Sequence, residues 1–212
     1  MTRPNIMTIN PDTPAEPILK MAVDILRKDG ILLAPTETRY GLLTRIDRPD
    51  TVRELYRMKR RRLDQPTAVF LKSIAEIDRY ARPTVCSSKL AKWFLPGPMT
   101  VVLSAHENLP APVTVDGKIG IRVSSSAVIA GLLDRIDFRL TATSANLSGE
   151  PEAETVAEIA EIFGETVPLY LDAGPLGGPP STVVDCTGDR PVVLRRGVIA
   201  EEEINRVIGK AL

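Results

Sequence analysis

The sequence contains very little histidine, cysteine or aromatic side chain: its 212 residues include one histidine, two cysteines and 4% aromatics. His106 lies in a polar stretch after an apolar run, as loop residues do. With no Cys-His pair, a triad hydrolase is nearly excluded. Cys86 and Cys186 are too few and too far apart in sequence for a disulfide framework or a zinc site. We interpret both as buried, unreactive thiols, and we expect no metal-ligating residues.

The chain also lacks net charge and any long apolar run. Lys+Arg and Asp+Glu number 27 each, so the field of the whole molecule does not attract nucleic acid, and RNA binding would need a local basic patch. No apolar run approaches the roughly 20 residues that span a bilayer. Residues 1–10 lack the basic-then-apolar order of a secretory signal. We therefore expect a soluble, cytoplasmic protein with no membrane partner.

Length and apolar content favour a single domain over residues 1–212, with its core at about 15–200. A hydrophobic fraction of 43% is sufficient for an aliphatic core. The one Gly/Pro-rich loop, 174–180, is too short to separate two domains.

Short helices and strands alternate along the chain. Thr13 and Glu16 are spaced as a capping box, with Pro14 at the first helical position of a helix that ends near Gly30. Apolar spacing predicts further helices opening at 51 and 73, and over 88–95, 127–133, 155–163 and 201–208. Short apolar runs predict strands over 31–34, 40–46, 67–71, 100–103, 119–123, 140–143, 169–171, 182–184 and 192–194. Several strands in direct succession favour an α/β or α+β fold with a mixed sheet.

Polar fragments follow several of these apolar runs. In residues 35–42, Thr36, Thr38 and Tyr40 supply three hydroxyls within five residues, which suit a small polar substrate. A turn stabilised by local threonine hydrogen bonds would also explain them. The four cations at 59–62 suit a polyphosphate or an RNA backbone, or else a solvated helix C-terminus.

Two later fragments have the same character. Ser144 and Asn146, in the turn 143–149 after a predicted strand, offer a hydroxyl and an amide that suit an anion or the edge of a base. A helix N-cap is the alternative. The proline-rich segment 178–185 leads into a strand, and Arg195 ends the next one. A hairpin with an incidental surface arginine would explain that pair.

The order and spacing of the fragments resemble a known family. The segments are PTETRYGL, YRMKRRRLDQP, LPGPMTVVL, IGIRV, TATSANLSG, STVVD and LRRGVI, and they extend over roughly residues 15 to 200. Together they resemble the YrdC-type threonylcarbamoyl-AMP synthase family. The Lys-x-Arg and Ser-x-Asn pairs are fairly specific, and the full ordered set is much more so.

The resemblance implies a YrdC-like domain, in which a twisted mixed sheet with flanking helices surrounds a positively charged concave cavity. It also implies a nucleotidyltransferase that makes L-threonylcarbamoyladenylate and pyrophosphate from L-threonine, bicarbonate and ATP. Because the product serves threonylcarbamoyladenosine modification of tRNA, tRNA or double-stranded RNA and tRNA-modification proteins are expected partners. Mg²⁺ is expected to arrive with ATP, held mostly by substrate and water.

This chemistry needs no protein nucleophile, only alignment of the reactants and cations around the charge that develops on phosphate. By matching motif positions, the resemblance implies a catalytic role for Lys59 and Arg61. It implies substrate contacts at Thr38, Arg122 and Ser181. It implies ATP contacts at Arg61, Gln65, Ser144, Asn146 and Arg195.

Several positions depart from the family pattern. Phe70 stands where histidine is frequent, Gln65 where asparagine is common, Arg39 in place of a small apolar residue, and Leu43 in place of glycine. Longer relatives carry a further C-terminal domain over the site, and because the sequence ends at Leu212 we expect no such domain here.

An RNA-binding or ribosome-maturation protein of the YciO-like sister group, on the same fold, is the alternative interpretation. The exposed cations expected at Arg60 and Arg62 favour it. The Lys-x-Arg and Ser-x-Asn pairs favour the enzyme, because YciO-like proteins often lack them.

Overall fold

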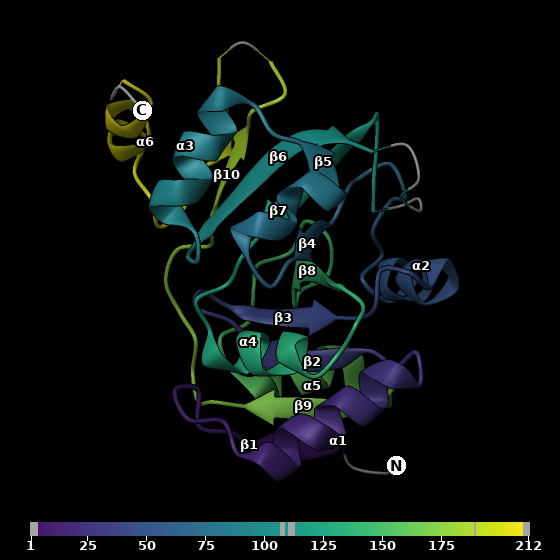
Figure 1. The fold of residues 1–212 in the computed structure, drawn as a ribbon. Helices are drawn as coiled ribbons and strands as arrows, with labels where there is room; N and C mark the ends of the chain where they lie inside the picture. The colour runs from purple at the N-terminus through teal and green to yellow at the C-terminus, as the bar shows by residue number, and fades with distance from the viewer. Residues whose placement is uncertain (1–3, 107–108, 110–112, 189, 210–212) are drawn as a thin grey trace.

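A twisted mixed sheet runs through the molecule, with helices packed against it (Figure 1). The computed structural model describes residues 4–106, 109, 113–188 and 190–209. The described strands are β1 (Ile6–Thr8), β2 (Leu32–Pro35), β3 (Tyr40–Leu43), β4 (Ala68–Phe70), β5 (Ala81–Arg82), β6 (Met99–Ala105), β7 (Lys118–Arg122), β8 (Leu140–Ser144), β9 (Leu169–Asp172), β10 (Thr182–Asp185) and β11 (Val192–Arg195). The helices are α1 (Glu16–Arg27), α2 (Pro49–Met58), α3 (Val85–Phe94), α4 (Ala127–Asp134), α5 (Val156–Phe163) and α6 (Glu201–Ile208), with 3₁₀ turns η1 (Ile74–Arg79) and η2 (Gly164–Thr166).

The strand order is β1-β9-β2-β3-β8-β4-β7-β6-β10-β11, and β5 pairs with β6. Parallel pairs such as β1–β9 and β10–β6 occur beside antiparallel pairs such as β2–β3 and β6–β7, which confirms the predicted mixed α/β fold. Two halves meet at β8, which pairs with β3 on one side and β4 on the other. We call β1, β9, β2 and β3 the lower half, and β4, β7, β6, β10 and β11 the upper half, as in Figure 1.

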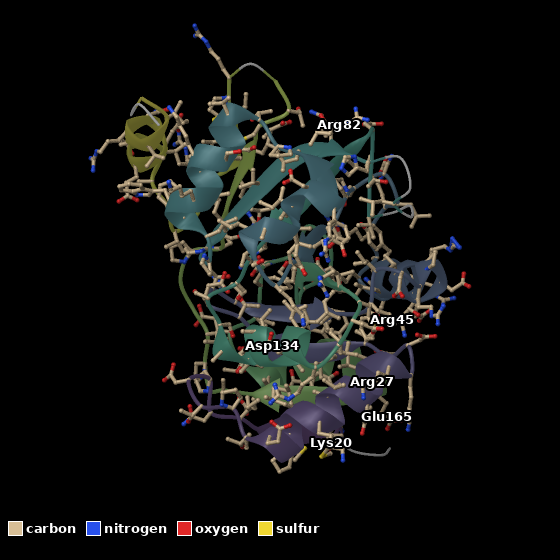
Figure 2. The ribbon with its side chains drawn as sticks, in the orientation of Figure 1. Lys20, Arg27, Arg45, Arg82, Asp134 and Glu165 are labelled. Atoms are coloured by element: carbon tan, nitrogen blue, oxygen red, sulfur yellow. The ribbon has the colours of Figure 1, made fainter. Side chains whose placement is uncertain are left out.

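Alternation along the strands places helices on both faces of the lower half. Leu32 and Ala34 of β2 join the apolar cluster of α1 and α4, whereas Leu33 between them joins the cluster of α5. The outer face of α1 carries the exposed side chains of Lys20 and Arg27 (Figure 2). In the upper half, α3 and α6 cover a third cluster on one face of β6, β7 and β10.

The predicted capping box at the start of α1 is wrong. The side-chain oxygen of Asn10 accepts hydrogen bonds from the backbone N–H groups of Asp12 and Thr13, at 2.9 and 3.0 Å, so Thr13 belongs to a turn. The helix begins after Ala15, which has no capping side chain, and the proline in its first turn is Pro17 rather than Pro14.

Other element ends differ by a few residues. α2 begins at Pro49, before the predicted start at Thr51, because proline is favourable at a first helical position. The helix expected after Ser73 is the 3₁₀ turn η1. The two-residue β5 and the three-residue β1 were not predicted, since neither is long enough to show a period. Gly164 ends α5 as expected, with a positive φ of 52°.

The two cysteines, distant in sequence, lie together in the fold. The Cys86 side chain packs against the upper-half cluster that contains Cys186, and the two thiols are in hydrogen-bond contact. Cys186 is buried as predicted, whereas Cys86 is only partly buried, because its side chain lies at the edge of the cluster. Burial raises the pKa of both, that of Cys186 to about 12, which lowers the reactivity of both thiols. His106 lies in a loop, with Nε2 2.9 Å from the Asp78 carbonyl oxygen. Among the described helices, none is long and apolar enough to cross a membrane.

Candidate functional site

A cavity of about 430 Å³ opens where the two halves of the sheet meet. Strand alternation builds its floor. Thr100 and Val102 of β6 and Gly120 and Arg122 of β7 line it, whereas Val101 faces the core on the other side of the sheet. A Cβ on Gly120 would lie 3.2 Å from the side chains of Ala68 and Thr100, closer than most Cβ contacts. Glycine therefore leaves these neighbours in place at the floor of the cavity.

Most of the residues proposed from sequence converge on this cavity. Its lining includes Thr38, Arg61, Arg122, Ser144, Ser181 and Arg195. They come from the β2–β3 turn, the segment after α2, strands β7, β8 and β11, and the position just before β10. The other three, Lys59, Gln65 and Asn146, do not line it. Each instead contacts a lining residue or its neighbours.

Lys59 is 1% exposed and lies behind the cavity wall. Its Nζ donates to the carbonyl oxygens of Ser144 and Asn146, the latter at 2.7 Å, and lies 3.3 Å from Asn146 Oδ1. Its own carbonyl oxygen accepts a hydrogen bond of 2.8 Å from the backbone of Ser148. Lys59 therefore fixes both ends of the Ser-x-Asn turn.

The pKa of Lys59 is lowered to about 7. Burial is the main cause, the charge of Arg61 lowers it further, and the carboxylate of Glu152 opposes both. The three oxygens around Nζ favour the ammonium form, which can donate to all of them. The oxygens of the Ser144–Asn146 turn therefore stabilise the buried ammonium group, and the ammonium group likewise fixes the turn.

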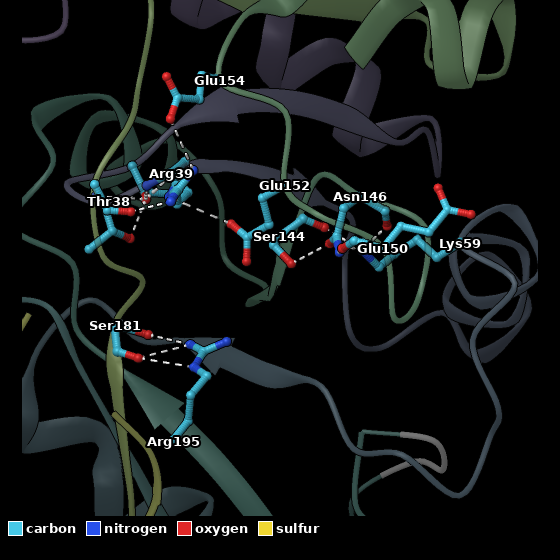
Figure 3. Close-up of polar contacts among 12 residues, drawn as sticks. Thr38, Arg39, Lys59, Ser144, Asn146, Glu150, Glu152, Glu154, Ser181 and Arg195 are labelled. Carbon is cyan, nitrogen blue, oxygen red and sulfur yellow. Dashed lines mark hydrogen bonds and ion pairs between the residues drawn. The ribbon is translucent and has the colours of Figure 1, made fainter. Parts of the chain in front are cut away.

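The Ser144–Asn146 turn presents one hydroxyl to the cavity (Figure 3). Ser144 Oγ donates to Asn146 Oδ1 at 2.6 Å, and Asn146 Nδ2 donates to the Glu150 carbonyl oxygen at 2.7 Å. The amide of Asn146 thus bridges Ser144 and the segment that follows the turn, which orients the serine hydroxyl.

Arg61 lines the cavity from the segment after α2. Its Nη2 donates to the Pro66 carbonyl oxygen at 2.6 Å, and its Nε lies 3.3 Å from the Gln65 carbonyl oxygen. The guanidinium carbon lies 5.5 Å from the ring centre of Tyr56, whose hydroxyl also donates to Gln65 O, at 2.8 Å. Gln65 therefore positions Arg61 mainly through its backbone.

Arg122 and Glu37 form an ion pair of 2.6 Å, each with a side chain 10% exposed. The same Nη2 lies 3.5 Å from Thr38 Oγ1, and the guanidinium carbon lies 5.0 Å from the ring centre of Phe70. Ser124 Oγ also donates to the Glu37 carboxylate. This network connects the upper half, which carries Arg122, to the β2–β3 turn of the lower half.

Ser181 and Arg195 lie together on the side of the cavity opposite the Ser144–Asn146 turn (Figure 3). Arg195 Nη2 donates to the carbonyl and hydroxyl oxygens of Ser181, at 2.9 and 3.0 Å. Ser181 Oγ lies 3.3 Å from Thr100 Oγ1. Burial lowers the pKa of Arg195, the charge of Glu152 opposes this, and the nearby Arg122 and Arg61 lower it further.

Six charged residues that line the site were not proposed from sequence: Arg39, Asp64, Asp116, Lys118, Glu152 and Asp185. Arg39 lies 3.9 Å from Glu152, and Lys118 lies 2.8 Å from Asp185. Each pair joins segments far apart in sequence, so no local pattern indicates it. Asp185 follows a predicted strand directly, and this position of a polar residue at a strand end was the sequence feature that could have indicated it as a site residue.

The cavity carries almost as many carboxylates as cations. The described lining has five cationic residues, Arg39, Arg61, Lys118, Arg122 and Arg195, and four acidic ones, Asp64, Asp116, Glu152 and Asp185. A strongly positive cavity therefore does not follow from the lining. Within the described parts of the chain, no three His, Cys, Asp or Glu side chains are grouped to hold a metal ion.

Comparison with known proteins identifies the family. The profile of the Sua5/YciO/YrdC family, described as "Telomere recombination", matches residues 24–197. The chain belongs to this family. It is 32% identical over 198 residues to the threonylcarbamoyl-AMP synthase of Bacillus subtilis, covering 92% of this chain and 57% of that protein. It is 29% identical over 193 residues to the Escherichia coli protein YciO, covering 90% and 94%.

Solved structures of the family have the same fold. Pyrococcus abyssi Sua5, in a structure described as complexed with L-threonine, superposes with a TM-score of 0.89 at 30% identity, over 96% of this chain and 61% of that one. E. coli YciO gives a TM-score of 0.84 at 28% identity, over 92% and 96%. This family member thus spans 57% of the length of the B. subtilis enzyme and nearly all of YciO.

Proposed function

We propose that this family member is a threonylcarbamoyl-AMP synthase, a nucleotidyltransferase that joins threonine, bicarbonate and ATP. One observation carries the proposal: Thr38 and Arg122 share a cavity with Arg61, Ser144 and Arg195. The first two suit an amino acid, the two other arginines suit a phosphate chain, and Ser144 suits a further contact on the nucleotide side. The synthase name of relatives at 31–32% identity and the threonine in the P. abyssi Sua5 structure support it.

The first step forms the carbamate. The unprotonated amine of threonine attacks the carbon derived from bicarbonate, a C–N bond forms, and one oxygen leaves as water. Thr38 Oγ1 suits the threonine hydroxyl. Arg122 has five N–H donors and uses Nη2 on Glu37 and Thr38, which leaves donors for a substrate carboxylate.

The second step transfers the nucleotide. A carbamate oxygen attacks the α-phosphorus of ATP, the bond to the bridging oxygen breaks, and pyrophosphate leaves with the electron pair. Arg61 and Arg195 supply fixed positive charge for the phosphate oxygens, and Ser181, whose oxygen accepts from Arg195, supplies a hydroxyl donor. Orientation and charge are sufficient for this chemistry, since both nucleophiles come from the substrates.

Three of the residues proposed from sequence serve as support. Lys59 holds the backbone of the Ser144–Asn146 turn, Asn146 orients the Ser144 hydroxyl, and the backbone of Gln65 holds Arg61. We therefore assign to Lys59 the positioning of the turn, with Arg61 as the cation that meets phosphate.

Mg²⁺ would accompany ATP and neutralise charge on its phosphates. The carboxylates at the cavity fit a metal held mainly by phosphate oxygens and water. Asp185 is paired with Lys118, Glu152 lies beside Arg39, and no grouped ligand set occurs among the described residues. Asp64, which forms an ion pair with Arg62, would contact the metal ion at most through a water molecule.

The product is a mixed anhydride of a carbamate and a phosphate, which hydrolyses readily and must pass to an acceptor. We propose transfer to tRNA adenosine, with tRNA-modification proteins as partners and the cytoplasm as the location. Bicarbonate as the carbon source belongs to the same proposal.

The test is a reconstituted reaction of protein, ATP, Mg²⁺, bicarbonate and threonine, followed by pyrophosphate release and by mass spectrometry of the adenylate. Pyrophosphate should appear only when threonine and bicarbonate are both present. Arg61→Ala should abolish it, whereas Arg60→Ala, one residue away and exposed, should not. Threonine-independent release, or none at all with tRNA and modification proteins supplied, would refute the proposal.

RNA binding is the second candidate, favoured by the match to YciO over nearly the full length of both proteins. The basic segment 59–62 gives it limited support, since Arg62 pairs with Asp64 and Lys59 is buried. Salt-dependent binding of structured RNA that survives Ser144→Ala would favour this function. ATP binding that Ser144→Ala weakens would favour the enzyme.

A further inference from the structure

A short loop, residues 174–180, crosses between the two halves of the sheet at the edge of the cavity (Figure 1). We call it the rim loop. It connects β9 of the lower half to β10 of the upper half. The Tyr40 hydroxyl donates to the Gly174 carbonyl oxygen at 2.6 Å, and the Leu176 N–H donates to the Glu154 carbonyl oxygen at 2.8 Å. Its first half is therefore fixed to the lower half of the sheet.

Arg39 holds the second half of the rim loop (Figure 3). Its Nη2 donates to the Gly178 carbonyl oxygen. Its Nε lies 3.9 Å from a Glu152 oxygen, and its Nη1 lies 4.0 Å from a Glu154 oxygen. One guanidinium thus joins the β2–β3 turn, the segment before α5 and the rim loop, three segments that are distant in sequence.

The contact at Gly178 bears directly on the phosphate side of the cavity. Gly178 has a φ of 108°, a conformation that side chains rarely adopt, and Pro179 and Pro180 follow with φ fixed by their rings. The next residue is Ser181, whose two oxygens accept hydrogen bonds from Arg195. A stiff three-residue connection therefore links the Arg39 contact to the Ser181–Arg195 pair.

Arg39 is poorly arranged for stability alone. Its Nε is buried and makes no hydrogen bond to any residue that the structure describes. Both carboxylates lie beyond hydrogen-bond distance of its nitrogens. A buried donor left without an acceptor opposes folding. Replacing Arg39 should therefore change the melting temperature little, and its effect should appear in the site.

We propose that Arg39 is a positioning residue of the ATP subsite, acting through the rim loop on Ser181 and Arg195. The inference rests on the proposed function. Because Arg39 follows Thr38 directly in sequence, it also connects the amino acid side of the cavity to the phosphate side. The guanidinium acts by holding Gly178 in place, without contact to the nucleotide.

The test compares the wild type with Arg39→Ala, Arg39→Lys and Glu154→Ala. Glu154 is a useful control because its carboxylate lies 4.0 Å from Arg39 and its side chain does not line the cavity. ATP affinity is measured by calorimetry. Amide exchange at Leu176 and Val198 is measured without ligand, since their N–H groups bond to Glu154 O and to Pro180 O of the rim loop.

Arg39→Ala should weaken ATP binding about tenfold or more, as misplaced groups do, and should speed exchange at Val198. Arg39→Lys should recover part of both, and Glu154→Ala should weaken ATP binding by a smaller factor. The loss in the double variant Arg39→Ala/Glu154→Ala should be less than the product of the two single losses, because both act through one contact.

Unchanged ATP affinity in Arg39→Ala would overturn the inference. Weaker ATP binding with unchanged exchange would also overturn it, since Arg39 would then contact ATP directly. If the wild type itself fails to bind ATP, the proposed function fails, and the exchange rates alone then decide whether Arg39 holds the rim loop.

Discussion

Lys59 Nζ lies 2.7 Å from the carbonyl oxygen of Asn146, in the protein interior and not in the cavity. A cation in this place binds backbone, so it influences a phosphate chain through the turn it supports. The two residues of the Lys-x-Arg pair thus have different roles: Lys59 supports the cavity wall from behind, and Arg61 lines the cavity.

We predict that Lys59→Met lowers kcat/KM for ATP by about 100-fold, because the Ser144–Asn146 turn loses the donor that fixes it. The free energy of unfolding should change by less than about 2 kcal/mol. Removing a buried charge is favourable, whereas leaving two carbonyl oxygens without a donor is unfavourable. Enzyme kinetics and urea unfolding measure the two effects, and Lys20→Met on the exposed face of α1 is the control. A collapse in stability would make Lys59 a purely structural cation.

The pH dependence of Lys59 gives a second prediction. Its pKa is about 7 in the folded protein, against 10.5 for an ordinary lysine. Above about pH 7 the ammonium loses a proton and one donor, so ATP affinity should fall as pH rises, at most tenfold per unit. Lys59→Met should lack this component, and because ATP itself titrates, the difference between the two proteins is the quantity to compare.

Unfolding should show the opposite trend. Between pH 7 and 10.5 the unfolded chain binds a proton at Lys59 that the folded chain does not, so the free energy of unfolding rises with pH across that window. Relative to Lys59→Met, the wild type should therefore gain stability as pH increases. An equal slope in both proteins would mean that Lys59 keeps its ordinary pKa.

A buried ion pair outside the cavity tests the fold itself. Arg139 contacts the Glu76 carboxylate through Nε, at 2.8 Å, and through Nη2, and their side chains are 8% and 12% exposed. We predict that Arg139→Ala destabilises the protein by about 3 kcal/mol, because it leaves a carboxylate in a poorly solvated place. Arg82→Ala, at an exposed position on β5, should cost far less. Thermal or urea unfolding measures both.

The loss in Arg139→Ala should itself depend on pH. Burial raises the pKa of Glu76, but the hydrogen bonds from Arg139 and Lys72 outweigh it, and the pKa is lowered from 4.5. The stabilisation is therefore present above about pH 4.5 and disappears as pH falls and the carboxylate is protonated. A loss that stays constant down to pH 3 would contradict this.

Local patterns were sufficient to predict much of this site. Ser144 and Ser181 adjoin apolar runs, and such positions lie at the edge of a sheet. Alternation along β6 similarly indicates which side chains face one side of the sheet. These signals depend only on neighbours in sequence, so they were visible before the fold was known.

The roles within residues 59–61 could not be predicted in the same way. Three adjacent cations look equivalent in sequence. In the structure Arg60 has a φ of 51°, and the Arg61 N–H bonds to the Tyr56 carbonyl oxygen at 2.8 Å, which ends α2 in a left-handed turn. That turn buries Lys59, exposes Arg60 and sends Arg61 to the cavity. Likewise, Arg39 and Glu152 meet only through the tertiary fold.

Thr36 and Thr38 allow the amino acid subsite to be tested with two matched variants. Thr36 Oγ1 donates to the Arg39 carbonyl oxygen at 2.7 Å and accepts from the N–H groups of Thr38 and Arg39, both at 3.2 Å. It therefore builds the turn. Thr38 Oγ1 makes only longer contacts, 3.2 Å to Thr36 Oγ1 and 3.5 Å to Arg122 Nη2, and it lines the cavity.

We predict that Thr38→Val weakens threonine binding about tenfold, the loss of one good hydrogen bond, and leaves ATP binding within about twofold of wild type. Thr36→Val should instead lower the free energy of unfolding by about 1–2 kcal/mol and weaken both ligands, because the turn loses its internal acceptor. Calorimetry with each ligand separates the two. If Thr38→Val weakened ATP and threonine equally, the hydroxyl would be shaping the whole cavity, and the amino acid would have to be placed on Arg122 alone.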